Sequence, residues 1–292
     1  MPFATANGRI YVKRTALLAV AALLFVQQAV ASPWLKDTAS AQKMAKQKNQ
    51  LIFVDLFAEW CGWCHKFEQE VIPSMAFQTA TDKMVLLRLN TEDGKDGSKF
   101  AREYGINSLP TFLVLNSDLM VAGMIKGYIP SNEFKQTLVD VEGKYKDFMK
   151  RVSDEGSIAK DYAKRLSLAK EFETRGAYPQ CETRLRKLVA EPAIPDGVRD
   201  DTYYELALTQ VLQGKLDDAR KTITKFGTIQ TKGDAFERSR LLVGDIYIQQ
   251  GNVAAAINEF RGFKNKYPSS PYNRNLDILI PKLESQMGGP RK

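Results

Sequence analysis

Histidine and cysteine are scarce in this chain of 292 residues, which holds one histidine and three cysteines. Structural zinc sites take four ligands, mostly cysteine and histidine, and no second pair of these residues is present to complete one. Three cysteines are too few, and too odd in number, for a scaffold held together by disulfides. We therefore expect no metal site, and we expect hydrophobic cores to hold the chain together.

An apolar run of the ~20 residues that a membrane-spanning helix needs is also missing. A shorter run at 16–26 follows three basic residues within positions 9–14 and precedes the small-x-small sequence at 29–31. This order is typical of a secretory signal peptide over residues 1–31, cleaved after Ala31, and an uncleaved anchor is the alternative. We expect the mature protein to function outside the cytoplasm, in a bacterial periplasm or otherwise secreted.

Dense blocks of basic residues do not occur either. The net charge is +8, but three of these charges precede position 15, and basic residues elsewhere alternate with acidic ones, as at 215–220. Such alternation is typical of a solvated surface, so no nucleic-acid partner is expected. With 44% hydrophobic residues the chain can build cores, and its length suggests two domains.

The chemistry is concentrated in residues 52–66. An apolar, strand-like run carries one acid, Asp55, and leads to Cys61 and Cys64. Two thiols three residues apart at the start of a helix lie on one face, close enough to bond to each other. The helix N-terminus stabilises the thiolate of the first cysteine and lowers its pKa. A reversible dithiol/disulfide catalyst needs this arrangement, and an inert disulfide is the alternative.

Hydrophobic patterns between residues 37 and 150 predict a mixed α/β domain. A helical crossover joins the first two strands, which should be parallel, and the last two strands form a hairpin. The result is a mixed sheet of four strands with helices on both faces. The predicted helices cover 37–48, 66–71, 99–104 and 131–150, and the predicted strands cover 51–57, 84–89, 111–115 and 119–125.

Several residues scattered over this region form one pattern. Asp55 stands six residues before the first cysteine, Arg88 precedes Leu-Asn, a Leu-Pro-Thr sequence ends at Thr111, and Gly127 follows the last predicted strand. Together with Trp-Cys-x-x-Cys, these residues resemble a thioredoxin-fold domain. Gln69 replaces the proline of the usual active-site helix, and a histidine follows the second cysteine. Both departures are similar to the branch that includes the C-terminal periplasmic domain of the transmembrane electron-transfer disulfide reductase.

The resemblance implies catalytic roles for four residues. Cys61 would be the exposed nucleophile that forms a mixed disulfide with a substrate, and Cys64 would be the resolving thiol. Asp55 would be a buried acid of raised pKa that accepts the proton of Cys64, unless it reaches water at the strand end. The bond before Pro110 would be cis and lie against the disulfide, where the alternative is an ordinary trans loop proline.

Substrate contacts are expected beside these residues. Trp60, Trp63 and Leu109 would form an apolar patch for a substrate segment, and the backbone of Leu109 would hydrogen-bond an extended substrate. The alternative for Trp60 is that it packs the loop. His65, one residue after the second cysteine, is expected on the outer side of the helix.

The sequence Cys61-Gly-Trp-Cys64-His65 also has the spacing of covalent c-type haem attachment. The single histidine excludes an iron held by two histidines, so a methionine, or no protein ligand, would take the second position. Because the thioredoxin-like pattern explains the same residues, we expect no cofactor besides the Cys61/Cys64 redox pair. A c-type haem protein stays the alternative.

Helical periodicity replaces the strand pattern after about residue 150. Gly176, Gly214 and Gly251 lie 38 and 37 residues apart, and each has small residues seven before and five after it and a large apolar residue nine after it. The pattern resembles three tetratricopeptide helix-turn-helix units, followed by a capping helix at 272–286. Cys181 occupies one of the small positions, where a packed hydrophobe is expected and a regulatory or intermolecular thiol is the alternative.

The sequence thus predicts a signal peptide at 1–31, a thioredoxin-like α/β domain at 32–152 and an all-α, tetratricopeptide-like domain at 157–292. We predict an exported thiol–disulfide oxidoreductase that reduces or exchanges disulfides of protein substrates. Such an enzyme would contribute to cell redox homeostasis. Its redox partner would be another protein, such as a membrane electron donor, and the repeats would dock proteins. Oxidase and isomerase activities stay open. An alternative of another class is a repeat-based binding or chaperone-like protein whose redox site is not essential.

Overall fold

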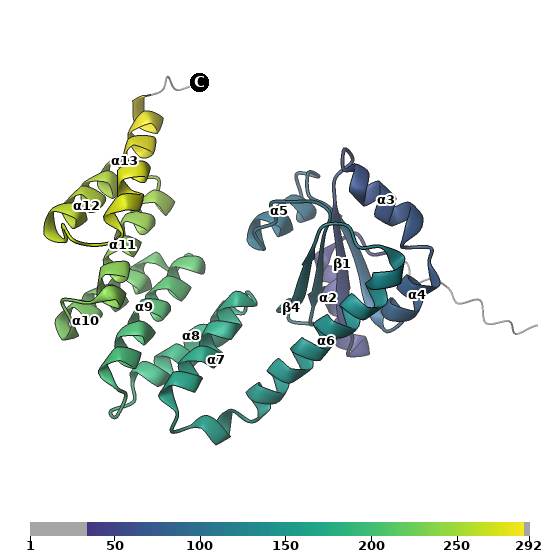
Figure 1. Ribbon diagram of the computed structural model, residues 1–292, viewed down its shortest axis with the longest axis horizontal. Helices are drawn as coiled ribbons and strands as arrows, with labels where there is room; N and C mark the ends of the chain where they lie inside the picture. Colours follow the sequence, from purple (N-terminus) through teal and green to yellow (C-terminus); the bar gives the residue numbers. More distant parts are fainter. Residues whose placement is uncertain (1–33, 289–292) are drawn as a thin grey trace, which may run out of the picture. The chain divides into compact units, whose positions relative to one another are not determined.

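The computed structural model describes residues 34–288, and the predicted signal peptide at 1–31 lies outside these residues (Figure 1). The first part of the described chain mixes helices and strands, as predicted, and the second part is helical. The α/β part consists of α2 (Thr38–Lys48), β1 (Leu51–Phe57), α3 (Gly62–Glu70), α4 (Met75–Thr81), β2 (Met84–Asn90), α5 (Asp96–Glu103), β3 (Thr111–Leu115), β4 (Val121–Lys126) and α6 (Ser131–Ser153).

Within residues 34–288, the strands form one mixed sheet in the order β2-β1-β3-β4. Strand β1 runs parallel to β2 and antiparallel to β3, and β3 and β4 form the predicted hairpin. The five central residues of β1 are all buried, because this strand has neighbours on both sides and helices over both faces. Asp55 is therefore carried into the interior together with its apolar neighbours.

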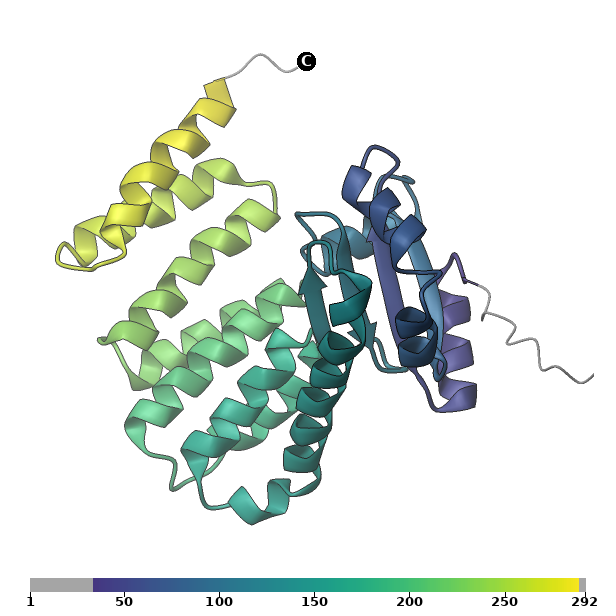
Figure 2. The ribbon, with the colours of Figure 1, turned by 45° about the vertical axis from the view of Figure 1, so that its right-hand side comes forward.

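Separate hydrophobic clusters cover the two faces of the sheet. On one face, Phe53 of β1 packs with Phe67 of α3 and Phe134 of α6. On the other face, Val54 of β1 packs with residues of α2 and with Phe100 of α5. Figure 2 accordingly shows α2 (purple) on the opposite side of the sheet from α6 (teal). Helix α3, which follows the strand that bears Asp55, is thus held against the sheet by its own aromatic side chain.

Several element ends differ from the sequence prediction. Helix α3 begins at Gly62, earlier than expected, because Sγ of Cys61 accepts the N–H of Cys64 and caps the first turn. Strand β4 begins at Val121 because Leu119 takes a φ of 63° in the preceding turn. Helix α6 continues to Ser153. The first of these differences matters for function, because it places the cysteines within the first turn of the helix.

The second part of the chain consists of paired helices. The glycines at 176, 214 and 251 have φ values of 70°, 71° and 72°, a left-handed conformation that costs glycine little. Each glycine ends the first helix of a pair, as the repeat spacing predicted, and the last helix corresponds to the predicted cap. These helices are α7 (Tyr162–Thr174), α8 (Tyr178–Val189), α9 (Asp196–Leu212), α10 (Leu216–Ile229), α11 (Asp234–Gln249), α12 (Val253–Lys266) and α13 (Asn273–Gly288).

The first repeat is bonded to the sheet. Nη1 of Arg175, at the end of α7, donates to the backbone oxygens of Val121 and Ala122, both at 3.0 Å, and the N–H of Val121 donates back to the oxygen of Arg175 at 2.9 Å. Met120 and Phe148 are buried in the same cluster as the core residues of α7 and α8. The start of β4 is therefore joined to the turn between α7 and α8 by one backbone hydrogen bond, two hydrogen bonds from the Arg175 side chain, and apolar contacts.

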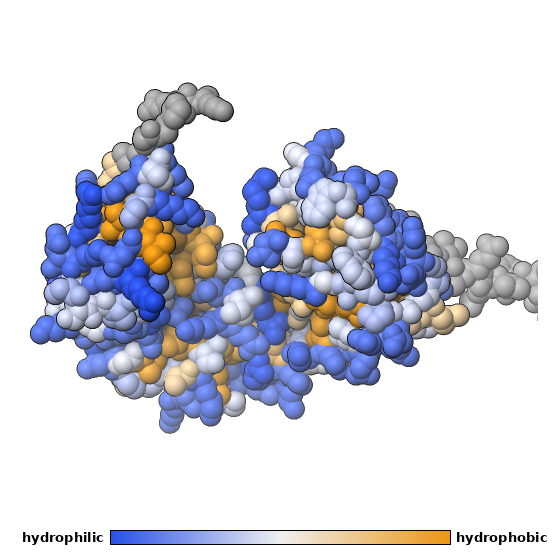
Figure 3. Space-filling model, turned by 45° about the horizontal axis from the view of Figure 1, so that its top comes forward, coloured by the Kyte–Doolittle hydropathy of each residue, from blue (hydrophilic) through white to orange (hydrophobic). Residues whose placement is uncertain are grey.

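The face shown in Figure 3 is mostly hydrophilic, with hydrophobic residues gathered in separate patches. Between residues 34 and 288, no helix is both long enough and apolar enough to cross a membrane.

Alanine substitutions at two glycines test how closely α11 and α12 pack in the third repeat. A Cβ on Gly244 of α11 would lie 2.1 Å from Cε1 of Phe260, a buried ring of α12, whereas a Cβ on Gly262 of α12 would meet nothing within 4 Å. We expect Gly244→Ala to lower the free energy of unfolding by about 1–3 kcal/mol through overpacking. Gly262→Ala should raise it by about 0.5–1 kcal/mol, because alanine is the better helix former. Urea unfolding of both variants measures this, and equal changes would contradict the packing.

Candidate active site

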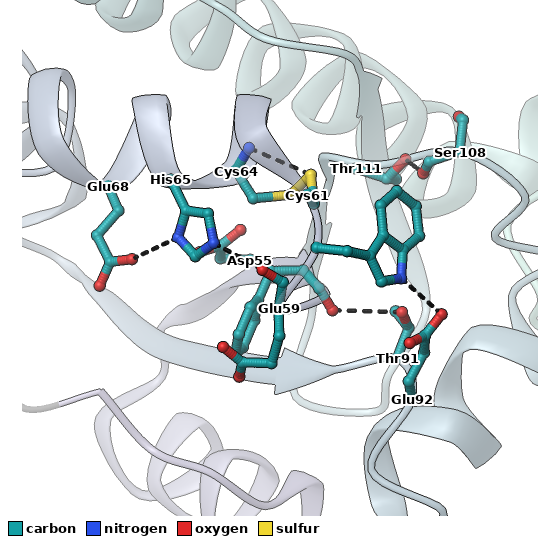
Figure 4. Close-up of a disulfide and its surroundings, with 12 residues drawn as sticks. Asp55, Glu59, Cys61, Cys64, His65, Glu68, Thr91, Glu92, Ser108 and Thr111 are labelled. Carbon is teal, nitrogen blue, oxygen red and sulfur yellow. Dashed lines mark hydrogen bonds and ion pairs between the residues drawn. A yellow bond between two sulfur atoms is a disulfide. The ribbon is translucent and has the colours of Figure 1, made fainter.

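The two cysteines of the Trp-Cys-x-x-Cys sequence form a disulfide at the start of α3 (Figure 4). Their Cα atoms are 5.2 Å apart, and the N–H of Cys64 donates to Sγ of Cys61 at 3.2 Å. Because Cys61 is the N-cap of α3, its sulfur faces the unpaired N–H groups and the positive end of the helix dipole. The predicted pairing of Cys61 with Cys64 is confirmed.

The exposure of the cysteines differs from the expectation. Cys61 was expected to be exposed, but it is only 3% exposed, nearly as little as Cys64 at 2%. Cys61 and Cys64 form a buried cluster with Ala58, and the partly buried Phe57 and Leu109 pack against this cluster. In the disulfide form, little of either cysteine is therefore open to solvent.

The carboxyl of Asp55 is 2% exposed, so it does not reach water at the strand end. Its closest charged partner is Nε of Arg88, 3.2 Å from Oδ2, and Oδ1 has no hydrogen-bond partner within the described part of the chain. The fork of the Arg88 guanidinium faces elsewhere: Nη1 and Nη2 donate to the two carboxylate oxygens of Glu68 of α3, at 2.6 and 2.8 Å. Arg88 thus divides its charge between a buried and an exposed acid.

Burial beside this shared cation makes Asp55 a weaker acid than an ordinary aspartate. Burial raises the pKa of Asp55 to about 7, because the interior disfavours a charged carboxylate; Arg88 lowers it and the carboxylate of Glu68 raises it. The hydrogen bonds from Arg88 hold the pKa of Glu68 below its usual value. The predicted raised pKa of Asp55 thus follows from burial with a partly neutralised partner, and it lets the group take up or release a proton near neutral pH.

His65 lies on the outer side of α3, as expected. Nε2 contacts the backbone oxygen of Glu59 at 2.8 Å, and Nδ1 lies 3.9 Å from Glu68 (Figure 4). Through Glu68 and Arg88, the histidine is connected to Asp55 by a chain of polar contacts.

The bond between Leu109 and Pro110 is cis, as the resemblance implied. The oxygen of Pro110 accepts the N–H of Gly127 at 2.9 Å, which ties this loop to the end of β4. The N–H and C=O of Leu109 have no hydrogen-bond partner among residues 34–288, while its side chain packs on the cysteines. The backbone that was expected to receive an extended substrate is therefore free.

Two tryptophans flank the disulfide. Trp60 is 68% exposed, which argues against its main role being to pack the loop, and its Nε1 donates to Glu92 at 2.8 Å. Trp63 is 57% exposed, and its ring lies 5.4 Å from the ring of Tyr128. Tyr128 was missed by the sequence analysis, although its position directly after Gly127 in the thioredoxin-like pattern was a signal for it.

A metal-binding cluster and the third cysteine are the further candidate sites outside the disulfide. Among residues 34–288 no group of three or more histidine, cysteine, aspartate or glutamate side chains is arranged to hold a metal. Cys181 is fully buried between repeat helices, with Sγ 3.4 Å from Oγ1 of Thr209. Burial raises the pKa of its thiol to about 11, as expected for a packed rather than a reactive cysteine.

A mixed sheet with a cysteine pair at the start of the helix after β1, packed against a cis-proline loop, defines a thioredoxin-like thiol–disulfide oxidoreductase. A family profile described as a thioredoxin-like domain matches residues 38–142, and one described as a tetratricopeptide repeat matches residues 238–270. Thioredoxin 1 of Nostoc sp. is 31% identical over 87 residues, which cover 30% of this chain and 76% of that protein. Through this region the chain belongs to the thioredoxin family.

Similarity to the thiol:disulfide interchange protein DsbD matches the predicted branch. The protein of Actinobacillus pleuropneumoniae is 23% identical over 96 residues, which cover 32% of this chain but 16% of that protein. Thioredoxin-T of Drosophila melanogaster is 30% identical over 74 residues, 25% of this chain and 44% of that protein. The chain thus spans less than half the length of these two relatives.

Among solved structures, the C-terminal domain of Neisseria meningitidis DsbD in the oxidised form is 18% identical, with a TM-score of 0.34 over 37% of this chain and 98% of that chain. The thioredoxin of Thermus thermophilus is 20% identical, with a TM-score of 0.34 over 38% of this chain and 87% of that chain.

Removal of the buried acid should stabilise the protein only at high pH. The native state binds a proton at Asp55 up to about pH 7, whereas the unfolded chain releases it near 3.8, the ordinary pKa of an aspartate. Stability is therefore lost as the pH rises between these values, by up to roughly 4 kcal/mol. We expect Asp55→Asn to raise the unfolding free energy of the disulfide form at pH 8.5 and to leave it nearly unchanged at pH 3.5, measured by urea unfolding. Equal gains at both values would show that the charge is not the cause.

The polar contacts around Arg88 predict a second effect on Asp55. Glu68→Gln removes the charge that competes for Arg88, so the pKa of Asp55 should fall. The matched control is Glu70→Gln on the same helix, because Glu70 bonds the hydroxyl of Tyr128 instead. Carbon-13 NMR titration of the Asp55 carboxyl in both variants is the measurement, and the same shift in both would disprove a specific effect of Glu68.

Proposed function

We propose that this protein reduces or exchanges disulfides in exported protein substrates through Cys61 and Cys64. The observation that carries the proposal is the buried Asp55 with a pKa near 7, held under the helix that begins with the cysteine pair. A static disulfide has no use for a buried carboxyl, which costs stability whenever it ionises. A thiol that must lose its proton inside the protein does have a use for one.

The reaction proceeds in two exchanges. The thiolate of Cys61 attacks a substrate disulfide, forms a Cys61–substrate bond and releases the other substrate sulfur as a thiolate, which takes a proton from water. Asp55 then accepts the proton of Cys64, whose sulfur attacks Cys61, forms the intramolecular disulfide and releases the second substrate sulfur. Two electrons pass from the cysteine pair to the substrate, and a redox partner restores the dithiol.

Two features favour reduction. The spacer between the cysteines, Gly62-Trp63, carries no charge that would destabilise the disulfide, and the acid at Asp55 matches the branch that the DsbD similarity indicates. The free backbone of Leu109 supports an extended protein substrate, because an N–H and a C=O in one residue pair with a strand.

Export and protein docking are further parts of the proposal. The order of basic residues, apolar run and small-x-small sequence within residues 1–31 supports a secretory signal peptide and a periplasmic location. The paired helices support docking of a protein, which we take to be either the substrate or a membrane-bound electron donor.

Cysteine variants test the reaction. Cys64→Ser should accumulate a mixed disulfide between Cys61 and one sulfur of the protein substrate, because the resolving thiol is absent, whereas Cys61→Ser should accumulate none. Cys181→Ser is the control, since its buried thiol faces no substrate and the variant should turn over like the wild type. Mass spectrometry after acid quenching detects the adduct. If the Cys61→Ser, Cys64→Ser double variant kept full activity, the redox function would be wrong and a binding or chaperone-like function would take its place.

The reduction potential of the pair decides the direction. A value near roughly −270 mV is expected for a reductase, and one near roughly −120 mV would assign the protein to the oxidases. Equilibration with glutathione buffers, read by alkylation of the free thiols, gives this value.

A further inference from the structure

Trp63 is held in a fixed position although more than half of its surface meets solvent. Its ring lies 5.4 Å from the ring of Tyr128, and the ammonium of Lys66 lies 5.3 Å from the ring of Trp63 and 5.2 Å from that of Tyr128. The hydroxyl of Tyr128 donates to Glu70 at 2.8 Å. An aromatic pair fixed by a cation and a hydrogen bond keeps its exposed face in one orientation, so little entropy is lost when a ligand covers it.

The pair lies beside the reacting disulfide for two independent reasons. Trp63 is in the spacer between the cysteines, directly before Cys64. Tyr128 follows Gly127, whose N–H is bonded to the oxygen of Pro110. The aromatic pair therefore lies next to the cis-proline loop, where Leu109 offers its unpaired backbone.

The chemistry of disulfide exchange determines what covers this surface. In the mixed disulfide a substrate cysteine is bonded to the sulfur of Cys61, so the substrate residues next to that cysteine lie within about 3.5–7 Å of it along an extended chain. Trp63 directly precedes Cys64, the disulfide partner of Cys61, so the residues beside the substrate cysteine can reach its ring. We therefore take these substrate residues as the ligand of the surface.

We propose that Trp63 and Tyr128 form a subsite that selects protein segments with an aromatic side chain next to the reacting cysteine, with Tyr128 as the residue that positions Trp63. This inference rests on the proposed function and adds the class of substrate to it. An incoming aromatic ring packs on the exposed part of the Trp63 side chain, a contact that Ala beside the cysteine cannot make.

Two peptide disulfides that differ in one residue test the subsite. One carries Phe and the other Ala directly before the cysteine, and the readout is the ratio of the two kcat/KM values on one enzyme, which cancels any change in thiol reactivity. We expect a ratio of roughly 3–10 for the wild type, since an aromatic pair changes an equilibrium by about this factor. Trp63→Ala should bring the ratio to about 1, and Tyr128→Ala should lower it, while Tyr128→Phe keeps the ring and the preference.

The control variant is Val139→Ala, an exposed apolar residue two turns into α6, which should leave both kcat/KM values unchanged. A ratio near 1 in the wild type overturns the subsite, and an unchanged ratio in Tyr128→Ala overturns the positioning role. Sedimentation tests a second copy of the chain as the ligand. If the wild type is a dimer, Trp63→Ala is a monomer and the ratio is near 1, the surface would be assigned to a second copy of the chain instead.

Reduction of glutathione disulfide separates these results from the proposed function. If the wild type reduces neither glutathione disulfide nor either peptide, the redox function itself fails. If it reduces glutathione disulfide and both peptides at equal rates, only the subsite fails.

Discussion

Burial of one carboxyl in the central strand of the sheet is the constraint on which the active site depends. Asp55 is buried because β1 is covered on both faces, and an interior acid is tolerated only if a cation or a proton neutralises it. Arg88 on the neighbouring strand is directly opposite Asp55 in the parallel register, but the same guanidinium also stacks on Phe57 and bonds Glu68. Because the cation is shared, neutralisation is incomplete, and the proton stays on Asp55 up to near neutral pH.

This sharing links the sheet to the helix that bears the cysteines. The contact between Arg88 and Glu68 crosses from β2 to α3, so the same side chain that tunes the acid also fixes the orientation of α3 over it. The acid, the disulfide and the cis-proline loop are consequently placed by three different elements whose relative positions depend on the aromatic core beneath α3.

The sequence predicted the regular parts of this structure because they depend on local patterns. The strands at 51–57 and 111–115 were predicted to the residue from their apolar runs, and the turn glycines of the repeats were found from spacing alone. The pairing of Cys61 with Cys64 and the cis bond before Pro110 followed from a motif that spans only part of the chain.

What the sequence did not predict depends on contacts between distant segments. The near-complete burial of Cys61 results from Leu109 and Phe57 packing over it, and no local pattern reports how closely two loops approach. The hydrogen bonds of Glu68 to Arg88 and the tilted contact between the rings of Tyr128 and Trp63 each join residues that are 20 or more positions apart. The bonds of Arg175 to β4 are of the same kind, because they connect positions separated by 53 and 54 residues.

These bonds have a consequence for how other chains can approach the sheet. Strands β2 and β4 are its outer strands, and an outer strand with free backbone groups invites strand addition and aggregation. Along β2, the N–H of Leu35 donates to Leu86, and its oxygen accepts from Arg88. At the start of β4, Arg175 occupies the oxygens of Val121 and Ala122. Both outer strands are thus partly paired by the chain itself, which reduces their tendency to pair with other chains. The backbone of Leu109 has no partner among residues 34–288, so a partner strand can gain hydrogen bonds beside the reactive sulfur without displacing native ones.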